Sequence, residues 1–165
     1  MVFRLIFYCV GIIIGFRLAP LASAASFGQI ISNRFIQVLQ STDASPANAA
    51  AKALDGSNAT FSLTADVAGS FWKAEAGRSY TLTRVELVNR LAPADVEMAG
   101  LTMRLYNIED QLAFQTNVTN PGSGGTWAVN LPTGLVARTL WVGLPGSQTN
   151  GGGNRRVGFA EAREQ

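Results

Sequence analysis

The sequence predicts an all-β protein, a sandwich or barrel of short antiparallel strands. Apolar and polar residues alternate with a period of two in several runs rich in β-branched and aromatic residues, which is typical of half-buried strands. Clusters of Gly, Pro and Asn separate these runs at short intervals, as they do in sandwiches and barrels. The sequence contains no long segment with a helical period and no internal repeat.

The chain begins with a predicted secretory signal peptide. Arg4 supplies a positive charge, an apolar run follows at residues 5–16, and small residues ending at Ala24 provide a cleavage site. A membrane anchor is the less favoured alternative, because the apolar run is shorter than the roughly 20 residues that span a bilayer. The predicted organisation is a signal peptide at residues 1–24, a short lead-in at 25–33 and one domain at 34–165.

Charge and composition limit the function classes. The chain has 13 basic and 11 acidic residues, and removal of Arg4 and Arg17 with the signal peptide leaves 11 of each sign. No basic tract remains to follow a phosphate backbone, so nucleic acid is not an expected partner. Cys9 is the only cysteine and the chain has no histidine, which excludes disulfides in the processed chain, His-based triads and His-ligated zinc.

The first predicted elements are a strand and a helical turn. Residues 34–40 alternate in the period of a strand, with Phe35 and Leu39 on one side. Turn-forming residues fill 41–47, and the alanine-rich segment 48–54 is expected to form a helical turn.

The central run carries two more strands. An aromatic pair lies in the strand at 70–74, and the longest alternating run covers 80–88. Apolar residues fall on both sides of that run, for example Leu82 on one side and Leu87 on the other, so its burial is not one-sided. The remaining strands are predicted at residues 101–107, 112–118, 126–131, 138–144 and 155–163.

The three tryptophans allow two interpretations. Trp72, Trp127 and Trp141 each lie in an alternating run beside apolar residues, so we expect them to pack in the core. The alternative is that a tryptophan presents its ring to a sugar.

Four short motifs give the sequence a resemblance to a known family. They are the A-x-D-G turn at residues 53–56, the Phe-Trp pair at 71–72, RVELVNR at 84–90, and LPG at 144–146 followed by FAEAR at 159–163. In this order, they resemble the discoidin, or coagulation factor type C, family of galactose-binding-like domains, and the F-type lectin (fucolectin) branch most of all. The resemblance implies a jelly roll of about eight strands that serves as a binding module.

The resemblance also implies a structural calcium ion beside the A-x-D-G turn. Calcium takes six to eight oxygen ligands from carboxylates, hydroxyls and backbone carbonyls. The matching positions are the carbonyls of Lys52, Ser57 and Ala160 and the side chains of Asp55, Thr60 and Glu161. The alternative is that Asp55 only caps its own turn and Glu161 faces solvent.

The sugar motif of the fucolectin branch is only partly present. Arg90 matches the arginine that donates hydrogen bonds to sugar hydroxyls. Leu63 stands where the motif has His, Ala92 replaces its Asp, and Glu97 replaces its second basic residue. Fucose recognition through this motif is therefore not expected, and Arg90 has the alternative role of pairing with Asp95 or Glu97.

A glycan would then be bound by another set of residues near the same end of the domain. The predicted ligand-binding residues are Arg90, Lys73 and Asp95, with the loop at 150–156 as a further candidate. Membrane insertion is not expected, because Asp95 and Glu97 interrupt the apolar residues that follow Arg90.

The expected function is an exported, non-catalytic module that binds glycans or glycoconjugates. The alternative is an extracellular adhesion or scaffold domain that binds protein or lipid without a working sugar site. An enzyme is the least favoured class, because the carboxylates are scattered and no nucleophile lies in a recognisable triad.

Overall fold

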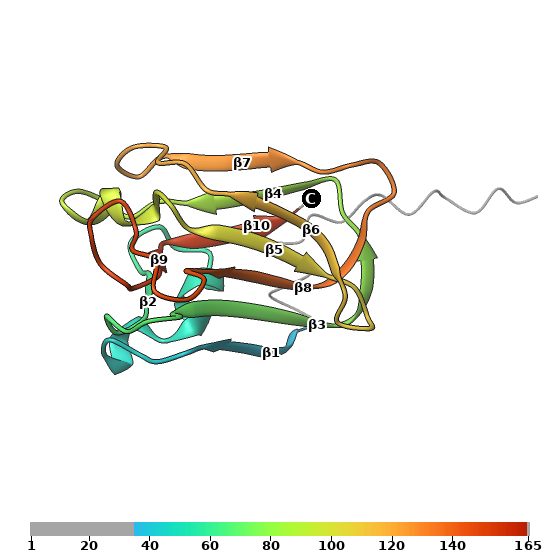
Figure 1. Ribbon diagram of the computed structural model, residues 1–165, viewed down its shortest axis with the longest axis horizontal. Helices are drawn as coiled ribbons and strands as arrows, with labels where there is room; N and C mark the ends of the chain where they lie inside the picture. The colour runs from blue at the N-terminus through green and yellow to red at the C-terminus, as the bar shows by residue number, and fades with distance from the viewer. Residues whose placement is uncertain (1–34, 165) are drawn as a thin grey trace, which may run out of the picture.

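The computed structural model describes residues 35–164, which form two stacked antiparallel sheets and a two-stranded ribbon (Figure 1). The strands are β1 (Phe35–Gln40), β2 (Ser62–Leu63), β3 (Phe71–Thr81), β4 (Arg84–Val88), β5 (Thr102–Tyr106), β6 (Leu112–Asn117), β7 (Thr126–Asn130), β8 (Val136–Gly143), β9 (Gly158–Phe159) and β10 (Glu161–Glu164). The 3-10 helices are η1 (Pro46–Asn48), η2 (Ala50–Leu54) and η3 (Ala94–Met98).

The strand order brings together segments that are distant in the chain. One sheet has five strands in the order β1-β3-β8-β5-β6, and the other has three in the order β10-β4-β7. β2 pairs with β9 as a short ribbon, and all paired strands in the described part are antiparallel. The predicted all-β sandwich is confirmed.

The core lies between the five-stranded and three-stranded sheets. In the first half of β3 the buried side chains come from alternate positions, as expected for a strand with one face on the core. The five-stranded sheet contributes Leu105 and Leu140, and the three-stranded sheet contributes Val85 and Leu87, all with no exposed surface. This apolar burial is the main source of stability in a domain whose described part has no cysteine.

Trp72 connects the five-stranded sheet to the ribbon and to η2. Its side chain is fully buried, and its indole Nε1–H donates a 2.9 Å hydrogen bond to the carbonyl oxygen of Ala50 in η2. Its ring meets that of Phe159 in β9 edge to face, with 5.1 Å between the centroids. One side chain therefore fixes the positions of η2 and β9 on the sheet.

The predicted strand at 80–88 is wrong in one respect, because the chain breaks at residues 82–83. β3 ends at Thr81 in the five-stranded sheet and β4 begins at Arg84 in the three-stranded sheet. Leu82 is buried at this crossing, and its N–H donates to the carbonyl of Leu135 instead of to a neighbouring strand. Both sides of the run carry apolar residues because the chain passes from one layer to the other.

The ribbon also changes the predicted strand list. The predicted strand at 155–163 is two strands, because Ala160 lies between β9 and β10 and donates its N–H to Val88. β2 was not predicted, since a two-residue strand leaves no measurable alternation. The described residues thus contain ten strands where about eight were predicted, and two of the ten, β2 and β9, have only two residues each.

The tryptophans divide into two groups. Trp72 and Trp127 are buried in the core as predicted, but Trp141 is only half-buried. Trp141 pairs with Lys73 and Arg104 on the neighbouring strands, and all three side chains lie on the outer face of the five-stranded sheet. The expectation that Trp141 packs in the core is therefore wrong, because no second layer covers that face in the described part of the chain.

The predicted signal peptide and lead-in lie outside the described residues. Within residues 35–164, no helix is long and apolar enough to cross a membrane.

We predict that Trp72→Phe destabilises the domain by about 2–4 kcal/mol. The substitution leaves the Ala50 carbonyl buried without its donor and opens space beside Phe159. Urea unfolding measures the effect, and Trp141→Phe is the matched control because Trp141 is half-buried and should lose less. An equal loss in the two variants would contradict the linking role of Trp72.

Candidate functional site

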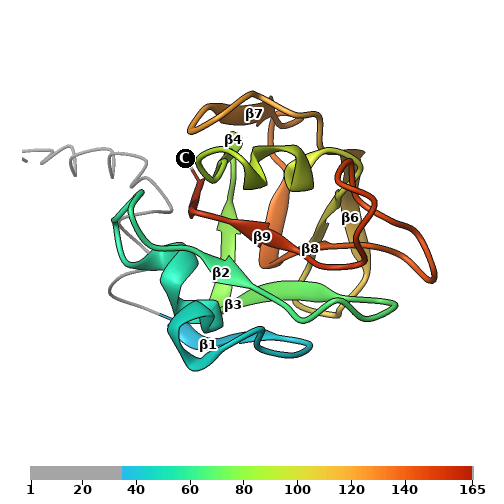
Figure 2. The same ribbon diagram turned by 90° about the vertical axis from the view of Figure 1, so that its left-hand side faces the viewer.

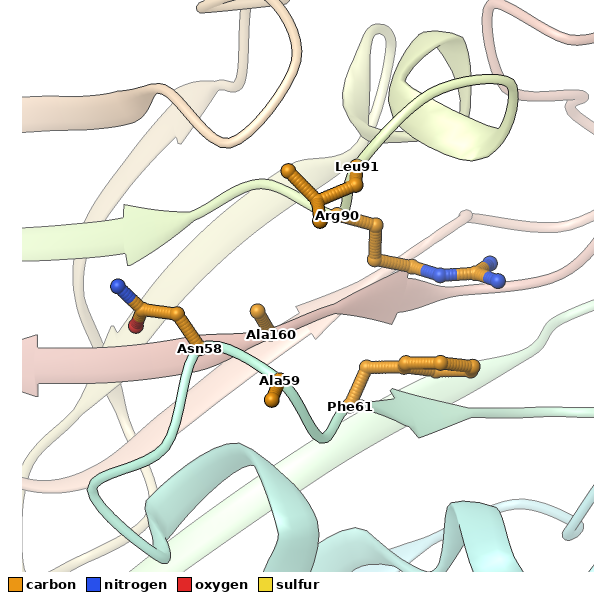
Figure 3. A pocket seen from close by; sticks show the side chains of 6 residues that line it. All are labelled: Asn58, Ala59, Phe61, Arg90, Leu91 and Ala160. Atoms are coloured by element: carbon orange, nitrogen blue, oxygen red, sulfur yellow. The ribbon is translucent and has the colours of Figure 1, made fainter.

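A small pocket lies at the end of the sandwich that carries the β2–β9 ribbon and η3, which is the end that faces the viewer in Figure 2. Its volume is about 110 Å³, and Figure 3 shows its walls. We call it the loop-end pocket, and it is lined by Asn58, Ala59, Phe61, Arg90, Leu91 and Ala160.

Arg90 and Phe61 form the most structured wall of this pocket. The guanidinium carbon of Arg90 lies 4.0 Å from the centroid of the Phe61 ring, close enough for a cation–π contact. Figure 3 shows the two side chains extending side by side in the same direction. Gly158 in β9 makes room for Leu63 and Arg90, because a Cβ atom there would lie 2.6 Å from Leu63 and 3.3 Å from Arg90 Nη1.

A buried carboxylate holds Arg90 in place. Glu97 in η3 is 2 % exposed, and one of its oxygens accepts a 2.7 Å hydrogen bond from Arg90 Nη1. Its other oxygen accepts from Arg156, with 2.7 Å to Nε and a second contact to Nη2. The cluster of two arginines and one carboxylate keeps a net positive charge beside the pocket.

Burial lowers the pKa of Arg90, and this effect is larger than the opposing effect of Glu97, while Arg156 adds to the lowering. Arginine stays protonated even so, because its ordinary value lies far above neutral pH. The Arg90 Nε is buried with no hydrogen-bond partner among the described residues. The guanidinium therefore retains donor capacity that its protein contacts do not use.

Asn89 sets the direction in which Arg90 leaves β4. Asn89 is buried, and its Nδ2 lies within hydrogen-bond distance of the Asp95 carbonyl (2.8 Å), Asn120 Oδ1 (3.0 Å) and the Gly122 carbonyl (2.9 Å). Its Oδ1 accepts from the N–H of Arg90. One amide thus joins η3 and the loop after β6 to the end of β4.

The residues predicted to bind calcium lie mostly together. Thr60 Oγ1 is 2.8 and 2.7 Å from the two carboxylate oxygens of Asp55 and 3.3 Å from the Ser57 carbonyl. Glu161 accepts a 3.2 Å hydrogen bond from the N–H of Gly56, which follows Asp55. The remaining two positions are chain neighbours of this cluster: Lys52 lies in η2 and Ala160 precedes β10.

The charges in this cluster fit a cation in part. Glu161 is 4 % exposed, so it does not face solvent. Burial raises its pKa to about 7, and Asp55 adds to the rise, although Arg163 and the Gly56 N–H oppose it. Within residues 35–164, no three Asp, Glu, His or Cys side chains converge, so a cation would depend on two carboxylates with hydroxyl and carbonyl oxygens.

Lys52 competes for the same carboxylate. Its Nζ lies 3.6 Å from Asp55 Oδ2. Partial burial alone would raise the pKa of Asp55, but hydrogen bonds from Thr60 and Ser57 and the charge of Lys52 together lower it. Asp55 is therefore ionised at neutral pH and available to a metal if the Lys52 side chain turns away.

Three solved structures with the same architecture are a lectin domain, a fucose binding module and a family 32 module in complex with galactose. The lectin domain of lectinolysin, in complex with Lewis B antigen, has a TM-score of 0.67 at 20 % identity, over 78 % of this chain and 91 % of that one. The Streptococcus pneumoniae fucose binding module SpX-3 has a TM-score of 0.67 at 16 % identity, over 78 % and 92 %. The family 32 module of C. perfringens NanJ, in complex with galactose, has 0.63 at 13 % identity, over 78 % and 91 %.

The chain has the discoidin-like, galactose-binding-like fold. A scan against protein-family models and a search of curated proteins found no match. At these identities the structural likeness establishes the fold and leaves the ligand to be argued from the residues of this chain.

Different residues occupy the positions of the fucolectin sugar motif in this structure. Leu63 is buried in β2, where the motif has His, and Ala92 is exposed, where it has Asp. Glu97 is the partner of Arg90, as one of the two pairing alternatives predicted. Arg156 places a second basic group against the same carboxylate, from a loop distant in sequence.

The three predicted ligand-binding residues do not share one site. Arg90 lines the loop-end pocket, and Asp95 lies nearby in η3 but is not among its lining residues. Lys73 lies on the outer face of the five-stranded sheet and lines a different pocket. Asn58 and Phe61 also line the pocket but were not predicted, although their place in the Thr/Ser loop beside the Asp55 turn was a usable signal.

We predict that, with chelator present, the domain becomes less stable as pH rises from 5 to 8. Glu161 in the folded state keeps its proton up to about pH 7, whereas the unfolded carboxyl ionises near 4.5. Between pH 4.5 and 7 the folded state therefore binds more protons than the unfolded state. The stability that Glu161 contributes is fully present below pH 4.5 and is lost as the pH rises through 7. Buried Glu164 contributes in the same direction, since burial raises its pKa well above the ordinary value.

Urea unfolding at several pH values measures this slope. Glu161→Gln should reduce it and raise stability at pH 8 by roughly 1–3 kcal/mol. Exposed Glu109→Gln is the control and should leave the slope unchanged. A slope equal to that of the wild type in Glu161→Gln would contradict the assigned titration.

Proposed function

We propose that this protein is an exported, non-catalytic glycan-binding module that holds a sugar residue in the loop-end pocket. The observation that carries the proposal is the Arg90–Phe61 pair, which is fixed in position by Glu97 before any ligand arrives. The lectin domain, the fucose binding module and the galactose-bound module of the same fold support a glycan as the ligand class.

The chemistry of the pocket suits a sugar. A pyranose ring presents hydroxyls along its edge and C–H groups on its face, so it needs hydrogen-bond donors next to an apolar surface. Arg90 and Asn58 offer polar groups, while Phe61 and Leu91 offer apolar surface. Because Glu97 and Phe61 already hold Arg90, binding loses little side-chain entropy.

We also propose that calcium binds the cluster around Asp55 and Glu161. In it, Asp55 and Glu161 supply carboxylates, Thr60 supplies a hydroxyl, and Lys52, Ser57 and Ala160 supply carbonyls. A divalent cation would offset the repulsion that helps to raise the pKa of Glu161. It would also stiffen the loop that carries Asn58 and Phe61, and in this way it would support the pocket.

Calcium is expected to raise the melting temperature of the domain, and chelator should reverse the rise. A ligand that binds only the folded state stabilises it by about 2.7 kcal/mol at 100 times its Kd. Differential scanning calorimetry measures the shift, which Asp55→Asn and Glu161→Gln should remove. Asp66→Asn is the matched control, since this exposed carboxylate pairs with Arg155 elsewhere. If calcium does not raise the melting temperature of the wild type, the role of Asp55 is limited to its turn.

Glycan binding is expected to depend on the pocket walls. A glycan array would select the sugar, and titration calorimetry with that sugar would compare variants. Phe61→Leu and Leu91→Ala should each weaken binding at least about tenfold, which is about 1.4 kcal/mol. Val67→Ser, at an exposed apolar residue outside the pocket, should bind like the wild type. Absence of binding across the array would favour the alternative, an adhesion domain for protein or lipid.

A further inference from the structure

The loop-end pocket is small for a sugar site. Its volume is about 110 Å³, below the roughly 300–1,000 Å³ of pockets that enclose a drug-sized ligand. A sugar residue therefore enters it with one edge or one substituent, and the rest of the ring lies outside, beside the 67 % exposed side chain of Leu91. The charge of the pocket walls then decides which substituent is preferred.

The walls of the pocket carry a positive charge and no carboxylate. Among the six described residues that line it, Arg90 is the one ionisable side chain, Asn58 is polar and uncharged, and the other four are apolar. Glu161 follows Ala160 in the chain but is not a lining residue, and its carboxylate accepts a hydrogen bond from the Gly56 N–H. A group that enters the pocket therefore meets a cation without a carboxylate on the same walls.

The Arg90 guanidinium keeps one nitrogen available to a ligand. Its Nη1 donates to Glu97, and its Nε is buried. Its Nη2 has no hydrogen bond to a described residue and is not among the buried unpaired atoms, so it reaches the surface. Phe61 covers one face of the guanidinium, which leaves the edge for a ligand oxygen. Hydrogen bonds from a guanidinium to an anionic oxygen are roughly twice as strong as those between neutral groups.

Arg156 makes the charge around Arg90 positive overall. Glu97 carries one negative charge and binds both arginines, Arg90 through one oxygen and Arg156 Nε at 2.7 Å through the other. The Arg156 side chain is 35 % exposed, and its charge acts on Arg90, whose pKa it lowers in addition to the effect of burial. Because charges interact over a screening length of about 8 Å at physiological ionic strength, Arg156 attracts an anion that Arg90 holds without touching it.

Arg163 adds a positive charge on another side of the pocket. Its Nη2 donates a 3.2 Å hydrogen bond to Asn58 Oδ1, and in the view of Figure 3 Asn58 lies on the other side of Ala160 from Arg90. The charge of Arg163 also acts on Glu161. Burial raises the pKa of Glu161 to about 7, so at neutral pH this carboxyl offsets Arg163 only in part.

We propose that the loop-end pocket prefers an acidic sugar residue, which it binds through a carboxylate or sulfate group, and that Arg156 determines this preference. The inference rests on the proposed function, because it names the class of sugar that the same pocket takes. Arg90 Nη2 donates to the anionic oxygen, and Arg156 and Arg163 strengthen the attraction through their charges. A neutral hydroxymethyl group in the same place gains none of this attraction, so the corresponding neutral sugar binds more weakly.

The test is a two-dimensional NMR titration of the full processed chain with two matched sets of probes. One set is methyl β-D-galactopyranoside, its 6-sulfate and methyl β-D-galactopyranosiduronate, and the other is the three corresponding glucosides. We expect at least one acidic probe to shift the amides of Asn58, Phe61 and Leu91 and to bind at least about tenfold more tightly than its neutral partner at about 50 mM salt. The sulfate and carboxylate members show which anionic group is preferred.

Salt and the neutral probes separate this inference from the proposed function. The preference for the acidic probe should fall to about threefold or less at about 500 mM salt, because screening weakens the attraction. Loop-end shifts with equal affinity for neutral and acidic probes would overturn the inference and leave the proposed function standing. An absence of loop-end shifts with all six probes would count against the pocket as a sugar site, and therefore against both.

Variants test the role of Arg156. Arg156→Gln should weaken binding of the acidic probe at least about threefold and leave the neutral probe unchanged, whereas Arg156→Lys keeps the charge and should keep the preference. Arg163→Gln leaves the Glu97 cluster intact and should weaken acidic binding in the same direction. Arg84→Gln is the control, since Arg84 begins β4 and Arg90 follows its other end. A full acidic preference in both Arg156→Gln and Arg163→Gln would overturn the inference.

Discussion

The buried indole of Trp72 is the interaction on which the loop end depends. Its hydrogen bond to Ala50 fixes η2, from which the Asp55 turn continues, and its edge-to-face contact with Phe159 fixes β9. β9 in turn pairs with β2, directly after Phe61, and Gly158 in β9 leaves the space that Arg90 fills. The position of the loop-end pocket is therefore set by core packing, and its chemistry is set by the residues on the loops.

The buried carboxylates of the domain differ in how well their charges are compensated. Glu97 is buried but accepts hydrogen bonds from two arginines, so its charge is compensated and it organises Arg90. Glu161 has weaker compensation, which is why burial raises its pKa and why a cation is an attractive partner for it. Glu164 faces the core opposite Val85 with neither oxygen hydrogen-bonded among the described residues, and it costs stability at neutral pH.

The sequence predicted the fold well and the site only in part. Strands such as 112–118 and 126–131 agree with β6 and β7 within one residue, because strand alternation is a local property. The break after Thr81 was not predicted, because the alternation of apolar and polar residues continues where the chain crosses from one sheet to the other. The contact of Glu97 with Arg156 could not be predicted, because the two residues are 59 positions apart in the sequence. The exposure of Trp141 could not be predicted either, because a period-two pattern does not tell which face of a strand remains uncovered.

The central claim is that a discoidin-like domain without the fucolectin sugar motif still holds a glycan at its loop end. Its most direct test is a crystal structure of the protein with the highest-ranking glycan from an array screen. The account predicts sugar density against Arg90 and Phe61, with the Arg90–Glu97 ion pair intact. Sugar bound elsewhere, with the loop-end pocket filled only by solvent, would contradict it.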